Sequence, residues 1–221
     1  MKIVAFVPIK LNNERLPGKN TKCFDDGKPL LTYFLEKITQ IEAINEFYVF
    51  CSDESVKAYL PPKVSFLKRP IFLDTKEATP QNIISEFMKY VSADIYCVCH
   101  CTNPFVSLEH FNETLSALLT GDFDSAFTAK KLQRLLWTDK RIPLNFDASN
   151  VPRTQDLAPL YDEVPAMYAF RKEVFIKLKR RIGLNPYITE LNEFESIDID
   201  YKEDFMLANL VYMNKEKLGM D

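Results

Sequence analysis

Two patterns of apolar and polar residues alternate along the chain. Short apolar runs rich in β-branched and aromatic residues are typical of buried strands, whereas apolar residues spaced three or four apart are typical of helices that cover a core. The runs predict strands at residues 3–7, 47–51, 64–67, 94–101, 124–130, 166–170 and 196–200, and the helical spacing predicts helices at residues 30–41, 79–91, 107–121, 173–181 and 201–218. This alternation predicts an α/β fold with a mostly parallel sheet and helices on both faces.

One long connection interrupts the alternation. The chain has 221 residues, which suits one α/β domain over residues 1–221. Residues 132–165 are mostly polar but contain Trp137, Leu157, Leu160 and Tyr161. A connection of this length is usually functional or forms a small subdomain, and mixed aromatic and apolar content is common at interfaces. We therefore expect a small subdomain here.

Charge and hydropathy exclude several classes of protein. The formal net charge of −3 argues against a general nucleic-acid binder. No apolar run reaches the roughly 18 residues of a membrane span, and the N-terminal residues lack the order of a signal peptide. We expect a cytoplasmic protein with no membrane or nucleic-acid partner.

The five cysteines are Cys23, Cys51, Cys97, Cys99 and Cys101. An odd number, with three in one apolar run, predicts reduced, buried thiols of a cytosolic protein. A zinc site at the last three is disfavoured, because side chains two apart on a strand lie about 6.8 Å from each other, farther than thiolates on one zinc ion.

The segment PIKLNNERLPGKN at residues 8–20 follows the first predicted strand, a place where open α/β sheets bind ligands. It carries three cations, Lys10, Arg15 and Lys19, which suit a polyphosphate. Pro17 and Gly18 indicate a turn that lets the backbone approach a ligand. A solvated surface loop is the alternative interpretation. Neither a P-loop nor a dinucleotide-binding glycine motif is present.

Paired carboxylates occur in SIDID at residues 196–200. On a strand, Asp198 and Asp200 share one face, and such a pair can hold Mg²⁺. Asp200 followed by Glu203 is also the pattern of a capping box that opens the last helix, so capping and metal binding are both open from the residues alone.

These motifs together resemble the sugar cytidylyltransferases, which activate sialic acid, Kdo and related acidic sugars as CMP-sugars. RLPGK at residues 15–19 resembles the family's opening loop, and Ile-Asp-Ile-Asp before the last helix matches its metal-binding strand. The resemblance extends from Lys2 to about Met213. The chain departs from the family pattern with Lys10 in place of Arg, His100-Cys101 in place of Gln-Pro, and Val164 near the family's Asn-Gly-Ala.

The resemblance implies a nucleotide-diphospho-sugar transferase fold and transfer of CMP from CTP to the anomeric hydroxyl of an acidic sugar, with release of pyrophosphate. It also implies a homodimer in which the subdomain reaches the partner's sugar pocket, and Mg²⁺ as cofactor. The implied site residues are Lys10, Arg15, Lys19 and Asp200 for catalysis; Lys10, Arg15, Lys19, Asn20, Arg69, Thr79, His100 and Thr102 for the nucleotide; Arg153 and Gln155 for the sugar; and Asp198 and Asp200 for the metal. From the residues alone, Thr79 fits the N-cap of a helix as well as it fits a nucleotide contact.

Two alternatives remain open. One is another sugar nucleotidyltransferase or a glycosyltransferase on the same fold, because fold does not fix function. The other is a non-catalytic protein that binds a sugar nucleotide, which the departures at Lys10, His100 and Val164 keep possible.

Overall fold

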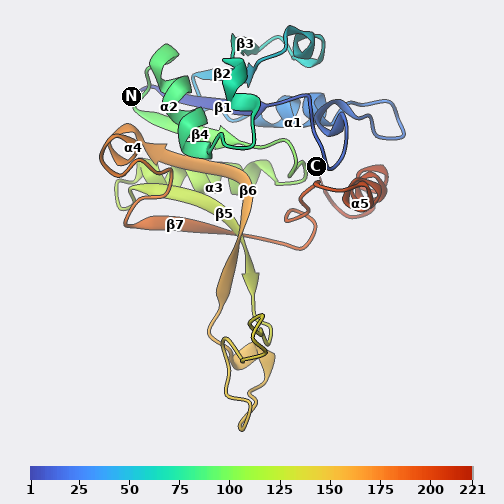
Figure 1. Ribbon diagram of the computed structural model, residues 1–221, viewed down its shortest axis with the longest axis vertical. Helices are drawn as coiled ribbons and strands as arrows, with labels where there is room; N and C mark the ends of the chain where they lie inside the picture. Colours follow the sequence, from blue (N-terminus) through green and yellow to red (C-terminus); the bar gives the residue numbers. More distant parts are fainter. Residues whose placement is uncertain (221) are drawn as a thin grey trace.

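Seven strands form one sheet in the order β3-β2-β1-β4-β6-β5-β7, in a computed structural model that describes residues 1–220 (Figure 1). The strands are β1 (Ile3–Ile9), β2 (Glu46–Cys51), β3 (Val64–Lys68), β4 (Ile95–Cys99), β5 (Ser125–Leu132), β6 (Leu160–Arg171) and β7 (Pro186–Leu191). The helices are α1 (Leu30–Ile38), α2 (Pro80–Tyr90), α3 (Leu108–Leu119), α4 (Lys172–Leu178) and α5 (Lys202–Met213), with short 3₁₀ turns η1 (Lys19–Thr21), η2 (Glu54–Tyr59), η3 (Ile71–Asp74) and η4 (Thr154–Asp156).

The sheet is mostly parallel, as predicted. Strands β3, β2, β1 and β4 run parallel, β6 is antiparallel to both of its neighbours, and β5 pairs with β7 in parallel. After β1 the chain builds outward through β2 and β3, and then returns to place β4 on the other side of β1. The crevice between the ends of β1 and β4 is therefore a topological switch point, where open α/β sheets bind ligands.

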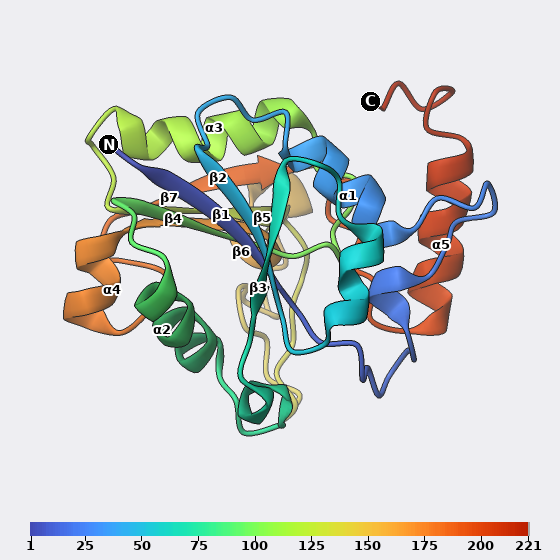
Figure 2. The same cartoon turned by 90° about the horizontal axis from the view of Figure 1, so that it is seen from above.

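Helices cover both faces of the sheet, because the central strands are apolar on both sides. On β1, Ile3, Ala5 and Val7 belong to one buried cluster, while Val4 and Phe6 belong to another. The first cluster includes the apolar faces of α1 and α3, and the second includes those of α2 and α4, on opposite sides of the sheet (Figure 2). This agrees with the period of two that a strand imposes on its side chains.

A third buried cluster holds α5 beside the opening loop. Phe24 stacks on Tyr212 with ring centroids 4.0 Å apart, and Phe205 lies 5.7 Å from Phe24 in a second stacked pair. Leu16 and Ile199 are buried in the same cluster, so it joins the loop after β1 to the segment before α5. Burial of a large apolar side chain is worth about 1.5–3 kcal/mol, which makes this cluster the anchor of both segments.

Beyond the sheet, β5 and β6 continue into an arm made of residues 133–159, which projects away from the rest of the molecule (Figure 1). Several large apolar side chains on it are more than half exposed, namely Trp137, Ile142, Leu144 and Val151. The small subdomain predicted at residues 132–165 and its role in dimerisation both remain predictions.

The predicted strand at residues 196–200 is wrong, because these residues lie outside the sheet. The strand at the edge of the sheet beside β5 is β7, which the apolar pattern did not indicate. The backbone of residues 196–200 is bound by loops instead: the Ile199 N–H donates to Thr102 O at 2.9 Å, and Asn103 Nδ2 donates to Ile197 O at 3.1 Å. Buried backbone groups need partners, but a sheet is not the only source of them.

The last two helices are shorter than predicted. Helix α4 ends at Leu178, ahead of the predicted end at residue 181, because Lys179 takes a left-handed conformation with φ 55°. Helix α5 ends at Met213, ahead of the predicted end at residue 218. Among residues 1–220, no helix combines the length and the apolar character needed to cross a membrane.

Candidate active site

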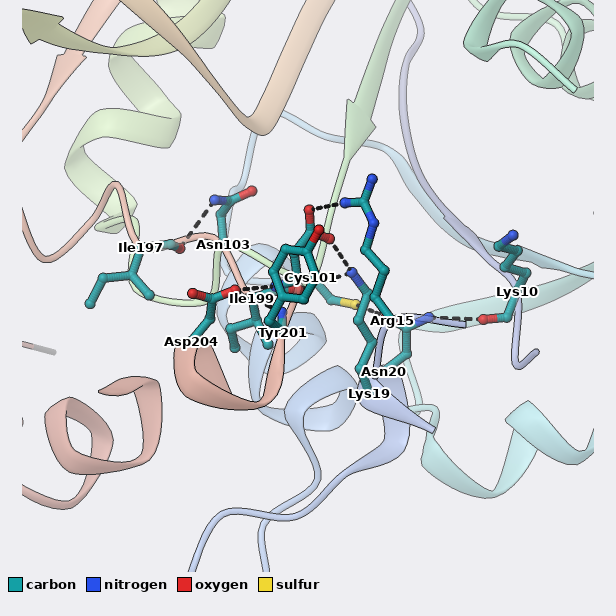
Figure 3. A network of polar contacts seen from close by, with 11 residues as sticks. Lys10, Arg15, Lys19, Asn20, Cys101, Asn103, Ile197, Ile199, Tyr201 and Asp204 are labelled. Carbon is teal, nitrogen blue, oxygen red and sulfur yellow. Dashed lines mark hydrogen bonds and ion pairs between the residues drawn. The ribbon is translucent and has the colours of Figure 1, made fainter. Parts of the chain in front are cut away.

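The loop after β1 and the loop after β4 meet segment 196–200 at the switch point (Figure 3). A cavity of about 400 Å³ opens there, lined by Lys10, Asn13, Glu14, Arg15, Leu16, Lys19, Lys76 and Asp200. Four of these side chains are cationic and two are acidic, so the cavity carries a formal excess of positive charge. An electropositive concave site of this size suits an anionic small molecule.

Two cations of the loop form ion pairs with one carboxylate. Lys19 Nζ lies 2.8 Å from Asp200 Oδ1, and Arg15 Nη1 lies 2.5 Å from Asp200 Oδ2. Partial burial alone would raise the pKa of Asp200, but the hydrogen bond from Lys19 and the charges of Lys19 and Arg15 lower it overall. Asp200 is therefore ionised at neutral pH, and the structure confirms that the three sequence-predicted residues lie together.

Of the two interpretations left open for Asp200, the capping box with Glu203 is contradicted by the structure. Tyr201 is the N-cap of α5, and the carboxylate of Asp204 accepts from the backbone N–H groups of Asp200 and Tyr201 at 3.0 and 2.7 Å. Asp204 takes this role because it stands three positions after the cap. The side chain of Asp200 is thereby left for the cavity.

Asp198 is the second carboxylate of this segment and fits a cation. Burial, together with the nearby charge of Asp200, raises its pKa, while a hydrogen bond from Thr102 and the charge of Lys19 oppose the rise. Its Oδ1 atom is buried and has no hydrogen-bond partner among the described residues. A buried carboxylate oxygen without a partner costs about 1–3 kcal/mol, and a bound divalent cation would remove that cost.

His100 and Thr102 lie on the loop after β4, and Asn20 lies on the loop after β1. The Asn20 side chain is 5% exposed, donates to Lys10 O at 3.0 Å and accepts from Cys101 Sγ at 3.5 Å, so it fixes the loop to the end of β4. Burial, together with the charges of Arg181 and Lys19, lowers the pKa of His100 to about 3. Its Nε2 atom is buried without a partner in the described chain, which leaves it available to a ligand.

Arg69 and Thr79 have structural roles in this ligand-free molecule. Arg69 is 3% exposed and forms an ion pair with Asp74, and its Nε atom has no partner within residues 1–220. Thr79 Oγ1 accepts from the Asn82 N–H at 3.2 Å, and the Asn82 side chain accepts in return from the Thr79 N–H at 3.0 Å. The N-cap interpretation of Thr79 is confirmed, and contact of either residue with a nucleotide stays a prediction.

Arg153 and Gln155 do not join the other predicted residues within one chain. Both are exposed on the arm, on and beside η4. Arg153 is 72% exposed and pairs with Asp156 through two contacts, from Nε at 2.7 Å and from Nη2 at 3.1 Å.

Three residues near the site were not identified from the sequence. Asn13 lines the cavity, and its buried Oδ1 atom has no partner in the part of the chain described. Lys76 lines the same cavity and pairs with Glu14 at 3.1 Å. Arg181 lies beside Tyr168 and His100. Only Arg181 could have been noticed in the sequence, because Arg180 and Arg181 stand just before Gly183, where the predicted helix was expected to end.

The cysteines are all free, and four of them are buried as expected, while Cys23 is exposed. Burial raises the pKa of Cys97 and of Cys101 to about 12, which keeps these thiols protonated. Within residues 1–220 no group of three or more His, Cys, Asp or Glu side chains is arranged to hold a metal ion.

Known proteins resemble this chain over almost its full length. A family model described as cytidylyltransferase matches residues 4–218. The N-acylneuraminate cytidylyltransferase of Streptococcus agalactiae serotype III is 23% identical over 93% of this chain and 52% of its own length. The enzyme of the same name from Escherichia coli O18:K1:H7 is 25% identical over 100% of this chain and 54% of its own length. The chain thus spans about half the length of these curated relatives.

Solved structures confirm the fold. The structure of CMP:2-keto-3-deoxy-manno-octonic acid synthetase, complexed with CTP, has a TM-score of 0.73 at 17% identity and covers 97% of this chain and 100% of its own. A 4-diphosphocytidyl-2C-methyl-D-erythritol synthase from Anaerococcus prevotii has a TM-score of 0.71 at 15% identity, with 96% of each chain covered. The predicted nucleotide-sugar transferase architecture is therefore correct.

Proposed function

Because this chain belongs to the cytidylyltransferase family, we propose that it transfers CMP from CTP to the anomeric hydroxyl of an acidic sugar and releases pyrophosphate. Relatives named N-acylneuraminate cytidylyltransferase and a fold neighbour bound to CTP support this activity. The observation that carries the proposal is the cavity at the switch point, where Arg15 and Lys19 meet the carboxylate of Asp200.

The cations of the loop bind the triphosphate in this proposal. Lys10, Arg15 and Lys19 face one cavity and neutralise the charge that builds up on the leaving pyrophosphate. The sugar hydroxyl attacks the α-phosphorus and loses its proton, while the bond from the α-phosphorus to the bridging oxygen breaks and pyrophosphate leaves. Reactions of this kind depend mostly on positioning and charge stabilisation. Of the three cations, Lys19 is best placed to stabilise this charge, because its side chain is only 13% exposed and is held by two hydrogen bonds.

Asp198 and Asp200 would hold Mg²⁺, with Thr102 orienting Asp198. When bound, the ion supplies a Lewis acid that polarises the phosphate and lowers the pKa of the attacking hydroxyl. The ion pairs of Asp200 with Lys19 and Arg15 fit this role, because a triphosphate would draw both cations away and leave the carboxylate to the metal.

The remaining nucleotide contacts belong to Asn20, Arg69, Thr79, His100 and Thr102. The buried, unpartnered Nε2 of His100 and Nε of Arg69 support this part of the proposal. Burial keeps His100 neutral, so its ring can accept or donate one hydrogen bond to a base edge.

The arm completes the sugar site in a homodimer. Arg153 and Gln155 lie on an arm that projects from its own chain, and the exposed apolar residues Trp137, Ile142 and Leu144 need a partner surface. A second copy of the chain is the partner that the proposal names, with Arg153 facing the sugar across the interface.

Pyrophosphate release tests the function. Purified protein is incubated with magnesium, each of the four NTPs and, in turn, N-acetylneuraminate, pseudaminic acid and 3-deoxy-manno-octulosonate. Release with CTP and one acid, together with the matching CMP-sugar in the product, is the expected result. Release with another NTP would indicate a different nucleotidyltransferase, and no release with any pair would overturn the proposal.

A further inference from the structure

Arg181 is a mostly buried arginine whose side chain donates no hydrogen bond within residues 1–220. Its guanidinium carbon lies 3.4 Å from the ring centroid of Tyr168, and its side chain is 20% exposed. Its one ion-pair partner in the described chain is Glu163, at 3.7 Å, which is beyond hydrogen-bonding distance. A guanidinium has five N–H donors, and leaving them unpaired in a partly buried position is unfavourable.

Tyr168 holds this guanidinium in a fixed plane. The Tyr168 hydroxyl donates to Glu163 Oε2 at 2.9 Å, which fixes the ring from its far end. Stacking of a guanidinium on an aromatic ring is favourable and orients the planar fork without using its donors. The fork is therefore set in place before any ligand arrives.

A cavity lies beside this fork. It has a volume of about 380 Å³ and is lined by Gln81, Glu163, Arg180, Arg181, Ile182 and Gly183. Arg180 donates to Gly183 O at 3.0 Å, so part of its fork is occupied. The two arginines and Glu163 give the cavity a formal charge of about +1, which suits a monoanion such as a carboxylate better than a phosphate monoester with nearly two charges.

The cavity adjoins the proposed nucleotide site through His100. Tyr168 is on β6, paired with β4, and its ring centroid lies 6.4 Å from that of His100 at the end of β4. The charges of Arg181 and Lys19 both act on the His100 ring, so both cations lie near it. A molecule at Arg181 would thus lie beside the nucleotide that Lys19 binds.

We propose that Arg181 binds the carboxylate of the acidic sugar through its planar fork, with Tyr168 as its support. The inference rests on the proposed function and names a second-substrate residue within the same chain. Arg153 is a weaker candidate for this contact, because two bonds to Asp156 already occupy its fork and it is 72% exposed.

The test compares an acid with its neutral methyl ester. Pyrophosphate release is measured with CTP, magnesium and the acid that reacts fastest among N-acetylneuraminate, pseudaminic acid and 3-deoxy-manno-octulosonate, and then with the methyl ester of that acid. The variants are Arg181→Gln, Arg181→Lys and, as the control for loss of one positive charge, Lys177→Gln on the exposed side of α4. The ratio of kcat/KM for acid over ester does not depend on the fraction of protein that is folded.

Arg181→Gln is expected to raise the KM of the acid about 10- to 100-fold, the loss that a charged bidentate contact represents, and to bring the acid-to-ester ratio close to one. Arg181→Lys should restore part of the preference, and Lys177→Gln should keep the wild-type ratio. The KM of CTP should change little in all three. An unchanged ratio in Arg181→Gln overturns the proposal, as does a ratio that collapses only in Arg153→Gln.

Failure of the proposed function gives a different result. If the wild type releases no pyrophosphate with any acid, binding of N-acetylneuraminate is followed directly by saturation-transfer NMR. Binding that Arg181→Gln loses and Lys177→Gln keeps would support the carboxylate site without the transfer reaction. No binding by the wild type, or equal binding by Arg181→Gln, would overturn the site itself.

Discussion

Lys19 Nζ lies 2.8 Å from Asp200 Oδ1, which joins a residue of the first loop to one 181 positions later in the chain. The same ammonium donates to the carbonyl of Ile199 at 2.9 Å, so it bonds both the backbone and the carboxylate of the segment before α5. The molecule without ligand thus holds its main phosphate-binding cation against its candidate metal ligand. Lys19 thereby lowers the pKa of Asp200 and helps to keep it ionised, and a triphosphate with its metal ion would separate the two groups.

Asp200→Asn should have opposite effects on binding and on turnover. Loss of the carboxylate frees Lys19 and Arg15, so CTP should bind about two- to fivefold more tightly without magnesium, the range of a surface ion pair. Pyrophosphate release with magnesium should fall at least about 100-fold. Isothermal titration without metal and the release assay measure the two effects.

The melting temperature of Asp200→Asn should stay close to that of the wild type, because the cap of α5 belongs to Asp204. Asp122→Asn, on an exposed loop, is the control for loss of one negative charge. Early melting of Asp200→Asn with full activity would show that the aspartate is structural and that the metal assignment is wrong.

Lys19→Ala should weaken CTP binding more than Arg15→Ala. A charge-assisted hydrogen bond is worth about 1.5–3 kcal/mol, and Lys19 should approach the upper value because its side chain is 13% exposed, against 60% for Arg15. Equilibrium dialysis with labelled CTP measures both, with Lys177→Ala as the control. Wild-type affinity in both loop variants would remove residues 10–19 from the nucleotide site.

His100→Gln should make stability less sensitive to acid. Burial and the nearby charges of Arg181 and Lys19 lower the pKa of His100 to about 3, whereas in the unfolded chain its pKa is near the ordinary value of 6.5. Between these values the unfolded state binds the extra proton, so the free energy of unfolding falls as the pH falls through this range. From pH 7 to pH 5 this one group should cost about 2 kcal/mol.

Urea unfolding of the wild type and of His100→Gln at pH 7 and pH 5 checks this loss. Glutamine cannot titrate, so the difference between the two pH values should be smaller in the variant by about that amount. An equal loss in both proteins would mean that His100 charges freely in the folded state.

The arm should determine the oligomeric state. Sedimentation at micromolar concentration should give a dimer, and Trp137→Ser with Ile142→Ser should shift it toward monomer, because both side chains are more than half exposed in the single chain. A wild-type monomer would refute the cross-subunit site.

Mixing two inactive variants tests whether the sites are shared. Arg153→Ala and Asp200→Asn chains, combined under conditions shown to exchange subunits, should regain part of the activity if Arg153 acts in the partner's pocket. No recovery would confine Arg153 to its own chain or remove it from any site. If Arg153 rather than Arg181 holds the carboxylate, Arg153→Lys should raise the KM of the sugar and leave that of CTP nearly unchanged, since lysine keeps the charge and loses the fork.

The positions of most helices and strands could be predicted because burial imposes a period on the residues themselves. The predicted helix at residues 30–41 formed over Leu30–Ile38, and the predicted strand at residues 3–7 formed over Ile3–Ile9. Segment 196–200 shows the limit, since its alternating pattern indicated a strand while its backbone found partners in the loops after β1 and β4. Alternation indicates which side chains are buried, but the tertiary structure determines which backbone pairs with which.

The sequence by itself determined the class of fold, the chemistry of the opening loop and the acidic pair at Asp198 and Asp200, because these depend on residue type and spacing along a short stretch. Only the tertiary structure decided that Asp204 and not Glu203 caps α5, that Lys19 and Arg15 share Asp200, and that Arg181 lies over Tyr168. Those contacts join segments that are far apart in the chain. They arise because a buried cluster at Phe24 and Phe205 and the pairing of β4 with β6 bring them together, and no local pattern encodes that approach.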